Sequence, residues 1–391
     1  MLSDWTLWLE WFIKSAFVIL ALLTGFAYLT WYERRALARI QSRIGPNRAG
    51  PQGLLQPIAD AVKLIFKEEL VPAKADRILF FWAPVITMVP SIILAAAIPF
   101  GPVTELFGRQ ISLSVANINV GVLYLMSIAS IAVYGIVLAG WSSNNKYAML
   151  GGLRSSAQMI SYELSLGLMF VTAIILADSM NLYEIVEEQR NMWFALVQPV
   201  GALIFLIVTL AEVNRAPFDM PEAEQELTAG YHSEYSGMKF ALFFMAEYQK
   251  MIVISMIAAT LFFGGYREFW FLKDTFLSVD ATWTIGSWQS QAWFLGPLYL
   301  LAKVVVLLFV MIWVRATWPR IRYDRLMAFG WKVLLPLSLV VAFITAAGVL
   351  LAEELNNPLW MWSIPMVSAF VGLFTVVMIY RDLRRKAYER A

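Results

Sequence analysis

Long uninterrupted apolar stretches constrain this chain more than any other feature of its sequence. The segment from Leu359 to Tyr380, for example, contains no charged side chain. A helix that crosses the hydrocarbon core of a bilayer needs roughly 20 such residues. The composition agrees, because 60% of the residues are apolar and 15% are charged, against about 25% charged in a typical soluble chain. We therefore predict an all-α polytopic membrane protein.

Nine stretches of this kind predict about nine transmembrane helices within a single integral membrane domain, residues 1–391. The expected spans are residues 11–32, 79–99, 118–141, 156–177, 193–212, 239–264, 294–314, 331–352 and 359–380. Between the first two spans, apolar and charged residues separate onto opposite faces of a short segment, about 57–68. This pattern predicts an amphipathic helix, which can lie in the bilayer interface or pack on protein.

The basic residues are distributed unevenly between the two sides of the predicted bundle. Four loops and the tail carry 21 Lys and Arg residues, whereas the opposite side carries four; the basic segments are 33–78, 142–155, 213–238, 315–330 and 381–391. Lys and Arg favour the cytoplasmic side of a membrane protein. We therefore expect the amphipathic helix and the C-terminus on the cytoplasmic side and the N-terminus outside.

The chain has no cysteine and a single histidine, His232. Iron–sulfur clusters and thiolate metal sites need cysteine ligands, so we predict no metal or cofactor bound by this chain alone. The turn-rich segment 45–53 lacks the Gly-Lys-Ser/Thr ending of a phosphate-binding loop. Nucleic acid is not an expected partner, because the basic residues lie on short loops next to the bilayer.

Acidic residues continue from one of these loops into the neighbouring spans. The loop 213–238 carries Asp219, Glu222, Glu224, Glu226 and Glu234, with Arg215 as its only basic residue. Ionisable side chains within predicted spans include Glu163, Glu212, Glu247, Lys250 and Lys303. Such groups are costly in a membrane and usually face a polar interior or a water-filled cavity, as a proton path requires. The alternatives are a solvated acidic loop and interhelical ion pairs that only stabilise the bundle.

The predicted spans give these carboxylates different depths. At 1.5 Å per residue, Glu163 and Glu247 should lie roughly 12–13 Å below the cytoplasmic surface, and Glu212 should lie near the surface itself. Lys250 shares a helix face with Glu247, three residues earlier. We therefore expect a graded series of carboxylates running inward from the acidic loop.

Six short motifs occur in a fixed order: Glu33–Arg35, Arg43–Asp60, Ile160–Glu163, Ala211–Asp219, Phe243–Tyr248 and Arg315–Asp324. Together they resemble the H-subunit family of the proton-pumping NADH–quinone oxidoreductase, respiratory complex I, whose mitochondrial counterpart is the ND-one subunit. The resemblance implies a membrane subunit that forms the membrane part of a quinone tunnel and links quinone reduction by NADH to proton translocation. Quinone would be the substrate, whereas NADH, FMN and iron–sulfur clusters would be bound by partner subunits.

The resemblance also implies roles for individual residues and partners. The quinone tunnel would include Glu33, Arg34, Arg35, Asp60, Phe218 and Arg315. A loop that responds to quinone would include Arg215, Asp219, Glu222, Glu224 and Glu226. The proton path would include Glu163, Glu212, Glu234 and Glu247. The pattern of charges within the spans adds Lys250 to this path. Implied partners are the peripheral-arm iron–sulfur and quinone-site subunits, small membrane subunits leading to antiporter-like subunits, and lipids.

Two features depart from the family pattern. The ninth predicted span has no counterpart in the mitochondrial subunit, which favours a bacterial protein of the cytoplasmic (inner) membrane. Lys250 stands where a neutral polar residue is expected, and we expect it to shift the proton affinity of Glu247. The alternative functions are a homologous subunit of a membrane-bound hydrogenase or of a ferredoxin- or F420-linked dehydrogenase, and a stand-alone proton-coupled transporter. The transporter is disfavoured because no inverted repeat is visible.

Overall fold

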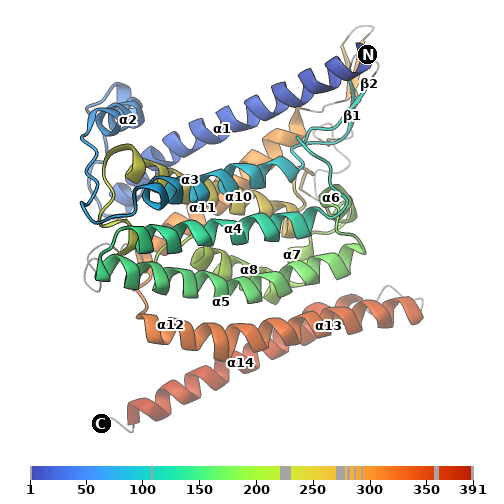
Figure 1. Cartoon of the computed structure of the whole chain (residues 1–391). Coiled ribbons are helices and arrows are strands. Elements are labelled where there is room, and N and C mark those ends of the chain that lie inside the picture. Colours follow the sequence, from blue (N-terminus) through green and yellow to red (C-terminus); the bar gives the residue numbers. More distant parts are fainter. Residues whose placement is uncertain are drawn as a thin grey trace.

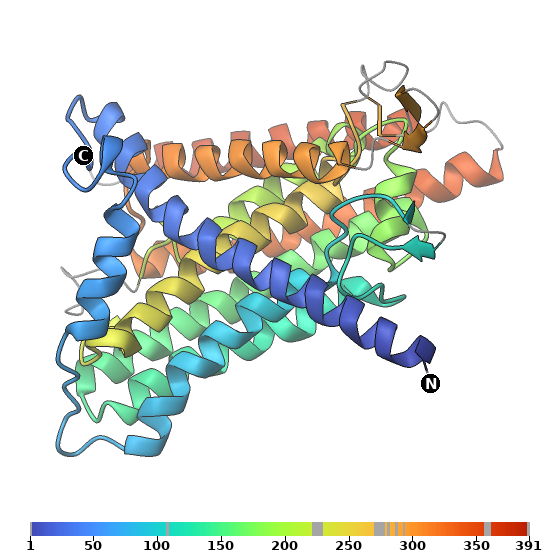
Figure 2. The ribbon, with the colours of Figure 1, turned by 90° about the horizontal axis from the view of Figure 1, so that it is seen from above.

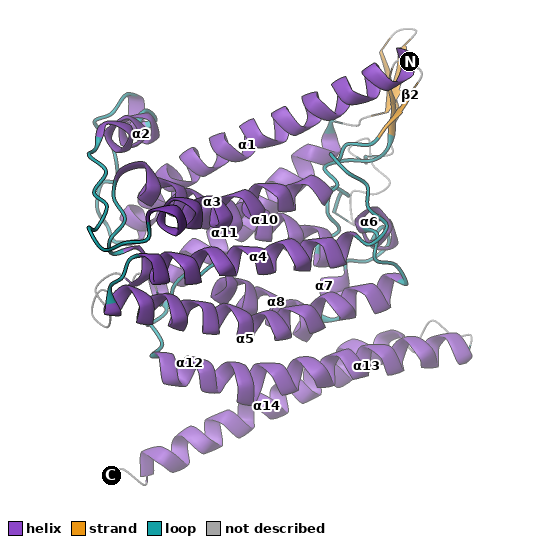
Figure 3. Ribbon diagram, viewed as in Figure 1, coloured by secondary structure: helices purple, strands orange, loops and turns teal. Residues whose placement is uncertain are grey.

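The computed structural model is a bundle of long helices lying side by side (Figures 1 and 3). It describes residues 2–106, 109–220, 230–269, 278–279, 282–285, 288–291, 294–355 and 361–388. Glu222, Glu224 and Glu226 lie outside these ranges. Among the described residues, eight helices are long and apolar enough to cross a membrane. The prediction of an all-α polytopic membrane protein is thereby confirmed.

These eight spans follow one another up and down the bundle. They are α1 (Leu2–Ile40), α3 (Arg77–Ile93), α4 (Gly121–Ser142), α5 (Lys146–Ala177), α10 (Gly237–Phe262), α11 (Leu295–Thr317), α13 (Leu335–Glu354) and α14 (Ser363–Tyr388). A 3-10 turn, Leu94–Ala97, extends α3, and α13 is preceded by α12 (Tyr323–Phe329) and a π-helical turn, Gly330–Leu334. In the view from above, α1 crosses the bundle diagonally (Figure 2).

The fifth predicted span, 193–212, is built differently from the others. It consists of α7 (Phe194–Val197) and α8 (Pro199–Glu212), which meet at Gln198, where φ is −130° and ψ is 71°. The 14 residues of α8 give a length of about 21 Å, which is less than the ~30 Å hydrocarbon core of a bilayer. Its last residue, Glu212, is only 2% exposed. The helix therefore ends inside the bundle rather than at its surface.

One end of the bundle gathers the predicted basic loops. We call it the basic end: residues 33–78, 142–155, 213–220, 230–238 and 315–330. Here Asp76 caps α3, because its carboxylate accepts hydrogen bonds from the backbone N–H groups of Ile78 and Leu79. The predicted amphipathic helix is present as α2 (Gln56–Phe66), with no buried residue. Its apolar face is left uncovered by the described residues.

The opposite end carries short elements that the hydropathy pattern does not predict. They are a hairpin of β1 (Thr104–Leu106) and β2 (Arg109–Ile111), a second hairpin of β3 (Thr282–Ile285) and β4 (Trp288–Gln291), and the helix α6 (Leu182–Glu188). Both hairpins are antiparallel, and they lie at the same end of the bundle as the start of α1 (Figure 1). The two ends of the bundle therefore differ in structure as well as in charge.

The core lies where α5, α8, α10 and α11 meet, and aromatic rings fill much of it. The ring of Phe205 lies 5.0 Å from that of Phe262 and 5.8 Å from that of Phe170. Offset and edge-to-face pairs at these distances add to the stabilisation from apolar burial. The polar groups described below are held within this packed interior.

Candidate functional site

The last turns of α1 point neighbouring charged residues in different directions. Glu33 is 2% exposed and faces the bundle, whereas the side chain of Arg34 is 47% exposed and faces α2. Successive residues of a helix project about 100° apart, so side chains of one turn can point into the bundle and toward its surface. The Glu33–Arg35 motif is thus divided between two environments.

On the inner side, Glu33 lies between two arginines. Its carboxylate accepts a hydrogen bond from Arg315 of α11, and Oε1 of Glu33 lies 3.5 Å from Nη1 of Arg215. Arg215 also lies 3.9 Å from Oε2 of Glu247 on α10. Its guanidinium sits 4.2 Å from the centre of the Tyr248 ring, a cation–π distance. Two carboxylates and two guanidinium groups therefore balance one another in a mostly buried cluster.

Arg215 belongs to the segment after α8, and a buried glutamine of α5 holds that segment. The side-chain N–H groups of Gln158 donate to the carbonyl of Ala211 at 2.9 Å and to the carbonyl of Phe218 at 2.7 Å. A third contact joins Gln158 to the side-chain oxygen of Asn214 at 3.3 Å. Asn214 adopts a positive φ of 54°, where asparagine is better tolerated than most residues. These bonds fix the path of the chain that carries Arg215.

The same segment is tied to the residues before α12. Arg320 donates to the backbone carbonyl of Asp219 at 2.7 Å and forms an ion pair with its carboxylate at 2.9 Å. Phe218 is buried, and its ring lies 5.6 Å from that of Tyr162 on α5. The predicted loop residues Arg215, Phe218 and Asp219 are therefore all anchored, each by a different element.

On the outer side of α1, a second cluster joins the segment 45–53 and α2 to the bundle. Arg34 forms an ion pair with Asp60 at 2.7 Å. Arg35 and Trp31 both donate to the backbone carbonyl of Gln52, at 3.0 and 3.2 Å. Arg34, Arg35 and Asp60, which were predicted to line one tunnel with Glu33, are thus exposed or half-buried. Arg34 and Arg35 lie on the outer side of α1, and Asp60 lies on α2.

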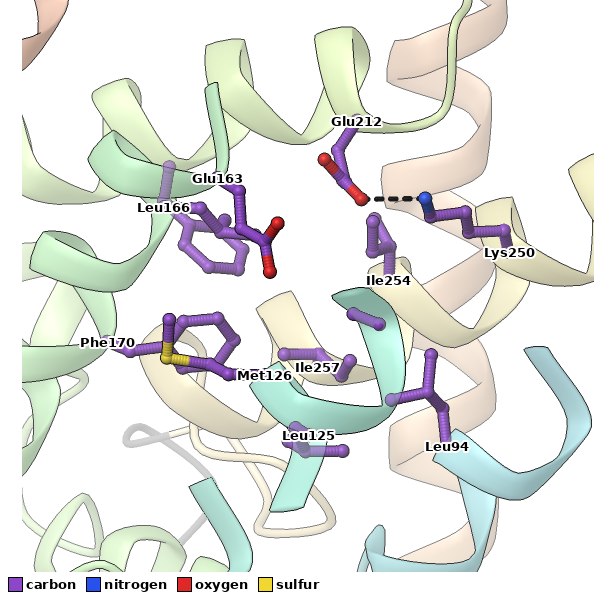
Figure 4. Close-up of a pocket in the computed structure, with 12 residues that line it drawn as sticks. Leu94, Leu125, Met126, Glu163, Leu166, Phe170, Glu212, Lys250, Ile254 and Ile257 are labelled. Atoms are coloured by element: carbon purple, nitrogen blue, oxygen red, sulfur yellow. Dashed lines mark hydrogen bonds and ion pairs between the residues drawn. The ribbon is translucent and has the colours of Figure 1, made fainter. Parts of the chain in front are cut away.

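Three of the predicted proton-path residues, Glu163, Glu212 and Lys250, form a separate cluster within the bundle (Figure 4). Nζ of Lys250 donates to Oε1 of Glu212 at 2.6 Å. Glu163 of α5 accepts a hydrogen bond from the hydroxyl of Ser130 on α4. A cavity of about 20 Å³ separates Glu163 from the Glu212–Lys250 pair, and all three side chains line it. The carboxylates of Glu163 and Glu212 face this cavity from different helices (Figure 4).

This arrangement differs from the graded series expected from the spans. Glu212 lies beside Glu163 rather than near the surface, because α8 is short and ends inside the bundle. Lys250 forms its ion pair with Glu212 and not with Glu247 on its own helix face. Lys303 lies apart from both clusters, where it donates to the backbone carbonyls of Gly265 and Arg267 at 2.9 and 2.7 Å.

Glu234 lies at the basic end, where Nδ2 of Asn145 donates to its carboxylate at 2.6 Å. The next residue, Tyr235, is buried beside Ser142, with the two hydroxyl oxygens 3.1 Å apart. Burial raises the pKa of Tyr235 to about 12, so its hydroxyl stays neutral at physiological pH. The structure therefore places Glu234 near the point where α4 ends and α5 begins, away from the cavity.

Several polar residues of these clusters were not predicted to be part of the site: Ser130, Gln158, Tyr248 and Arg320. Ser130 and Gln158 are polar residues within predicted spans, which is a usable signal because such groups need partners in a membrane. Tyr248 is the last residue of the Phe243–Tyr248 motif, and only the family resemblance of that motif marks it in the sequence. Nothing local in the sequence marks Arg320 among the four arginines of its loop.

No group of three or more His, Asp or Glu side chains in the described part of the chain could hold a metal ion. What the clusters offer is a set of paired charges next to apolar walls. Such groups can exchange protons and can respond when a neighbouring charge changes, because opposite charges at short range favour the ionised forms.

Comparisons with known proteins place these motifs in a family context. Residues 13–346 match the NADH dehydrogenase family. The H subunit of the NADH-quinone oxidoreductase of Thermomicrobium roseum is 50% identical over 335 residues, covering 83% of this chain and 92% of the relative. An H subunit from Geobacter sulfurreducens is 48% identical over 344 residues, covering 85% and 92%. The H subunit from Protochlamydia amoebophila is 48% identical over 328 residues, covering 83% and 92%. The helix α14 follows the residues of the family match.

Proposed function

The chain belongs to the H-subunit family of NADH–quinone oxidoreductase, the membrane subunits of respiratory complex I, and from this membership we propose that it forms the membrane part of the quinone-binding tunnel and couples quinone reduction to proton translocation. Electrons would come from NADH through FMN and iron–sulfur clusters of partner subunits. The basic end would face the cytoplasm of a bacterium, with the N-terminus outside the inner membrane.

The inner cluster supports a role next to the quinone. A quinone head group is a flat ring with two carbonyl oxygens, which accept hydrogen bonds from guanidinium groups. Arg315 and Arg215 supply such donors beside Glu33, and α2 lies close by with an uncovered apolar face. Arg34, Arg35 and Asp60 would then line the rim of the tunnel, and Phe218 would pack behind it. Peripheral-arm iron–sulfur and quinone-site subunits would complete the tunnel at this end.

The observation that carries the coupling proposal is the position of Arg215. It lies at ion-pair distance from Glu33 in the tunnel cluster and from Glu247, which is one helical turn from Lys250. A change of charge near the quinone would therefore alter the electrostatic interaction between Arg215 and Glu247. The loop that carries Arg215 and Asp219, together with Glu222, Glu224 and Glu226, would transmit this change.

The remaining carboxylates would pass protons on to small membrane subunits and then to antiporter-like subunits. In this proposal, Glu234 and Glu247 connect the basic end with the cavity cluster, and Glu163 lies on the far side of that cavity. The burial of Glu212 and Lys250 separates this part of the route from bulk water. Lipids would cover the outward faces of the spans.

The proposal is tested by replacing Glu163 or Glu212 with glutamine in the assembled complex. Membrane vesicles are assayed for NADH-driven quinone reduction and for acidification of the lumen, and electron transfer to ferricyanide reports on the peripheral arm. We expect quinone reduction and acidification to fall together by about tenfold or more, as for loss of a group that takes part in proton transfer, while ferricyanide reduction persists. Wild-type rates of both reactions in both variants would overturn the proposal.

A further inference from the structure

Lys250 is the feature of the cavity cluster that the proposed function leaves unexplained. Its side chain comes from α10 and is 8% exposed, and its ammonium donates to Oε1 of Glu212 at 2.6 Å. A buried lysine is costly unless it is paired, so a purely structural explanation is that the pair offsets its own burial. The second oxygen of the Glu212 carboxylate indicates a role beyond this structural one.

Oε2 of Glu212 is buried and makes no hydrogen bond to any described residue. A fully structural pair would be expected to satisfy both oxygens, because an unmade hydrogen bond in a buried carboxylate costs free energy. Glu212 borders the cavity that Glu163 also lines (Figure 4). One carboxylate oxygen is thus held by Lys250 while the other remains available at the cavity.

The size and lining of this cavity define what fits there. Its volume is about 20 Å³, and one water molecule needs roughly 10–15 Å³ by the same measure. Three of the lining side chains are ionisable, Glu163, Glu212 and Lys250, whereas the other nine are apolar. The space between Glu163 and Glu212 is therefore large enough for a single water molecule.

We propose that Lys250 is a positioning residue that keeps Glu212 ionised, so that a proton can pass from Glu163 to Glu212 through one water molecule in this cavity. The inference rests on the proposed function and adds to it the charge that controls this transfer. Lys250 acts through Glu212 rather than by carrying the proton itself.

The transfer conserves atoms and charge. A protonated Glu163 gives its proton to the water oxygen, and the water releases one of its own protons to Oε2 of Glu212. The O–H bond of Glu163 breaks, the O–H bond of Glu212 forms, and the water is regenerated. Glu163 ends as a carboxylate, and the ammonium of Lys250 favours the return of Glu212 to its ionised form once its proton moves on.

Among the charged groups around Glu212, Lys250 is the one that favours its ionised form. Lys250 and Glu163 are the charged side chains that act on this carboxylate. Of the other helices packed against α8, α7 has no charged residue, and the charges of α13 and α14 lie at their distant ends, Glu353, Glu354 and residues from Arg381 onward. Glu247, on the helix of Lys250, is the ion-pair partner of Arg215.

Removing the ammonium should therefore favour neutral Glu212, which cannot accept a proton. In Lys250→Met, quinone reduction and acidification by the assembled complex should fall about tenfold near neutral pH. The pH profile of quinone reduction should move by about one to three pH units toward alkaline values, the range over which an adjacent charge changes a carboxyl group. Lys250→Arg keeps the charge and should keep most of the activity. The KM for quinone should remain unchanged in both variants.

A second pair of variants tests the water. Ala129 of α4 lines the cavity, so Ala129→Leu fills the space and should lower quinone reduction without moving the pH profile. Ser127→Leu adds similar volume on the exposed face of the same helix and should have no effect. Ferricyanide reduction verifies assembly in every case.

Different outcomes separate this inference from the proposed function. A Lys250→Met complex that pumps with a wild-type pH profile overturns the inference and leaves the proposed function intact. Equal loss in Lys250→Met and Lys250→Arg with no change in pH profile overturns it as well, because the residue is then needed only for packing. Wild-type activity in the Glu163→Gln and Glu212→Gln complexes overturns the proposed function itself.

Discussion

Nη1 of Arg215 lies 3.5 Å from Oε1 of Glu33, which brings the segment after α8 against the end of the first helix. Both side chains are almost fully buried. Because Arg315 also contacts Glu33, this one carboxylate connects three separate parts of the chain. Removing a partner from such a buried group is far more costly than removing an exposed pair.

Arg315→Ala should reduce NADH-driven quinone reduction by about tenfold or more. Breaking a buried ion pair costs on the order of 3–5 kcal/mol. Because Arg315 is partly exposed, its loss should cost a fraction of that free energy. Ferricyanide reduction should stay at the wild-type rate. The matched control is Arg322→Ala, because Arg322 is 76% exposed and its ion-pair partner Asp324 is exposed as well. Equal loss of quinone and ferricyanide reduction in Arg315→Ala would indicate failed assembly instead of a tunnel defect.

Asp60→Ala should change quinone reduction much less than Glu33→Gln does. Its ion pair with Arg34 is half exposed, and pairs of this kind contribute about 0–1 kcal/mol. We expect less than a fivefold change in kcat/KM for quinone, and a double variant with Arg34→Ala should be no worse than either single one. Losses from Asp60→Ala as large as those from Glu33→Gln would place Asp60 in direct contact with the quinone.

Gln158→Leu should loosen the segment that carries Arg215, because two carbonyls and the Asn214 side chain lose their donor. Unsatisfied buried groups cost about 1–3 kcal/mol each, so the thermal midpoint of the complex should fall and quinone turnover should fall with it. Gln189→Leu removes a comparable buried glutamine at the opposite end, where it binds the carbonyl of Thr260. That variant should lose thermal stability while the kcat of the surviving complex remains unchanged.

Gly53→Ala should distort the segment 45–53. Gly53 has a φ of +77°, and a Cβ there would lie 2.3 Å from the backbone oxygen of Pro46, so the backbone must move. Limited trypsin digestion of membranes should then cleave at the exposed Arg48 several times faster than in the wild type. In the control Gly372→Ala, the new methyl meets the side chain of Val200 at 3.2 Å. Unchanged cleavage at Arg48 in Gly53→Ala would mean that the segment tolerates the distortion.

Hydropathy located most of the spans, because a long apolar helix is the default structure in a bilayer. The predicted span 118–141, for instance, lies close to α4, Gly121–Ser142. The hydropathy pattern could not show that α5 begins at Lys146, because Lys146 and Arg154 lower the hydropathy of the first turns of α5. The break at Gln198 is also absent from the hydropathy pattern, although Pro199 marks it in the sequence, and a hydrogen bond to Thr345 of α13 supports it.

The sequence indicated which charged residues are buried in the bundle better than it indicated how they pair. Rules for one helix connect Lys250 with Glu247, yet its partner is Glu212 of another helix, and no local pattern reveals that choice. Adjacent residues Glu33 and Arg34 were expected to share one tunnel, but their directions depend on how α1 rotates against α10 and α11. Residue types thus indicated which charges are buried, whereas the packing of the helices determines which charges form ion pairs.

Gln198 has a consequence for the biogenesis of this chain. The short helix α8 that follows it is too brief to be a strong membrane-insertion signal by itself. The side-chain amide of Gln198 donates to the hydroxyl of Thr345, at 2.6 Å, on a helix that the ribosome makes much later. Until α13 arrives, this amide must be held by water or by the insertion machinery. The amide of Gln198 therefore gains its final partner only when α13 has packed against α8.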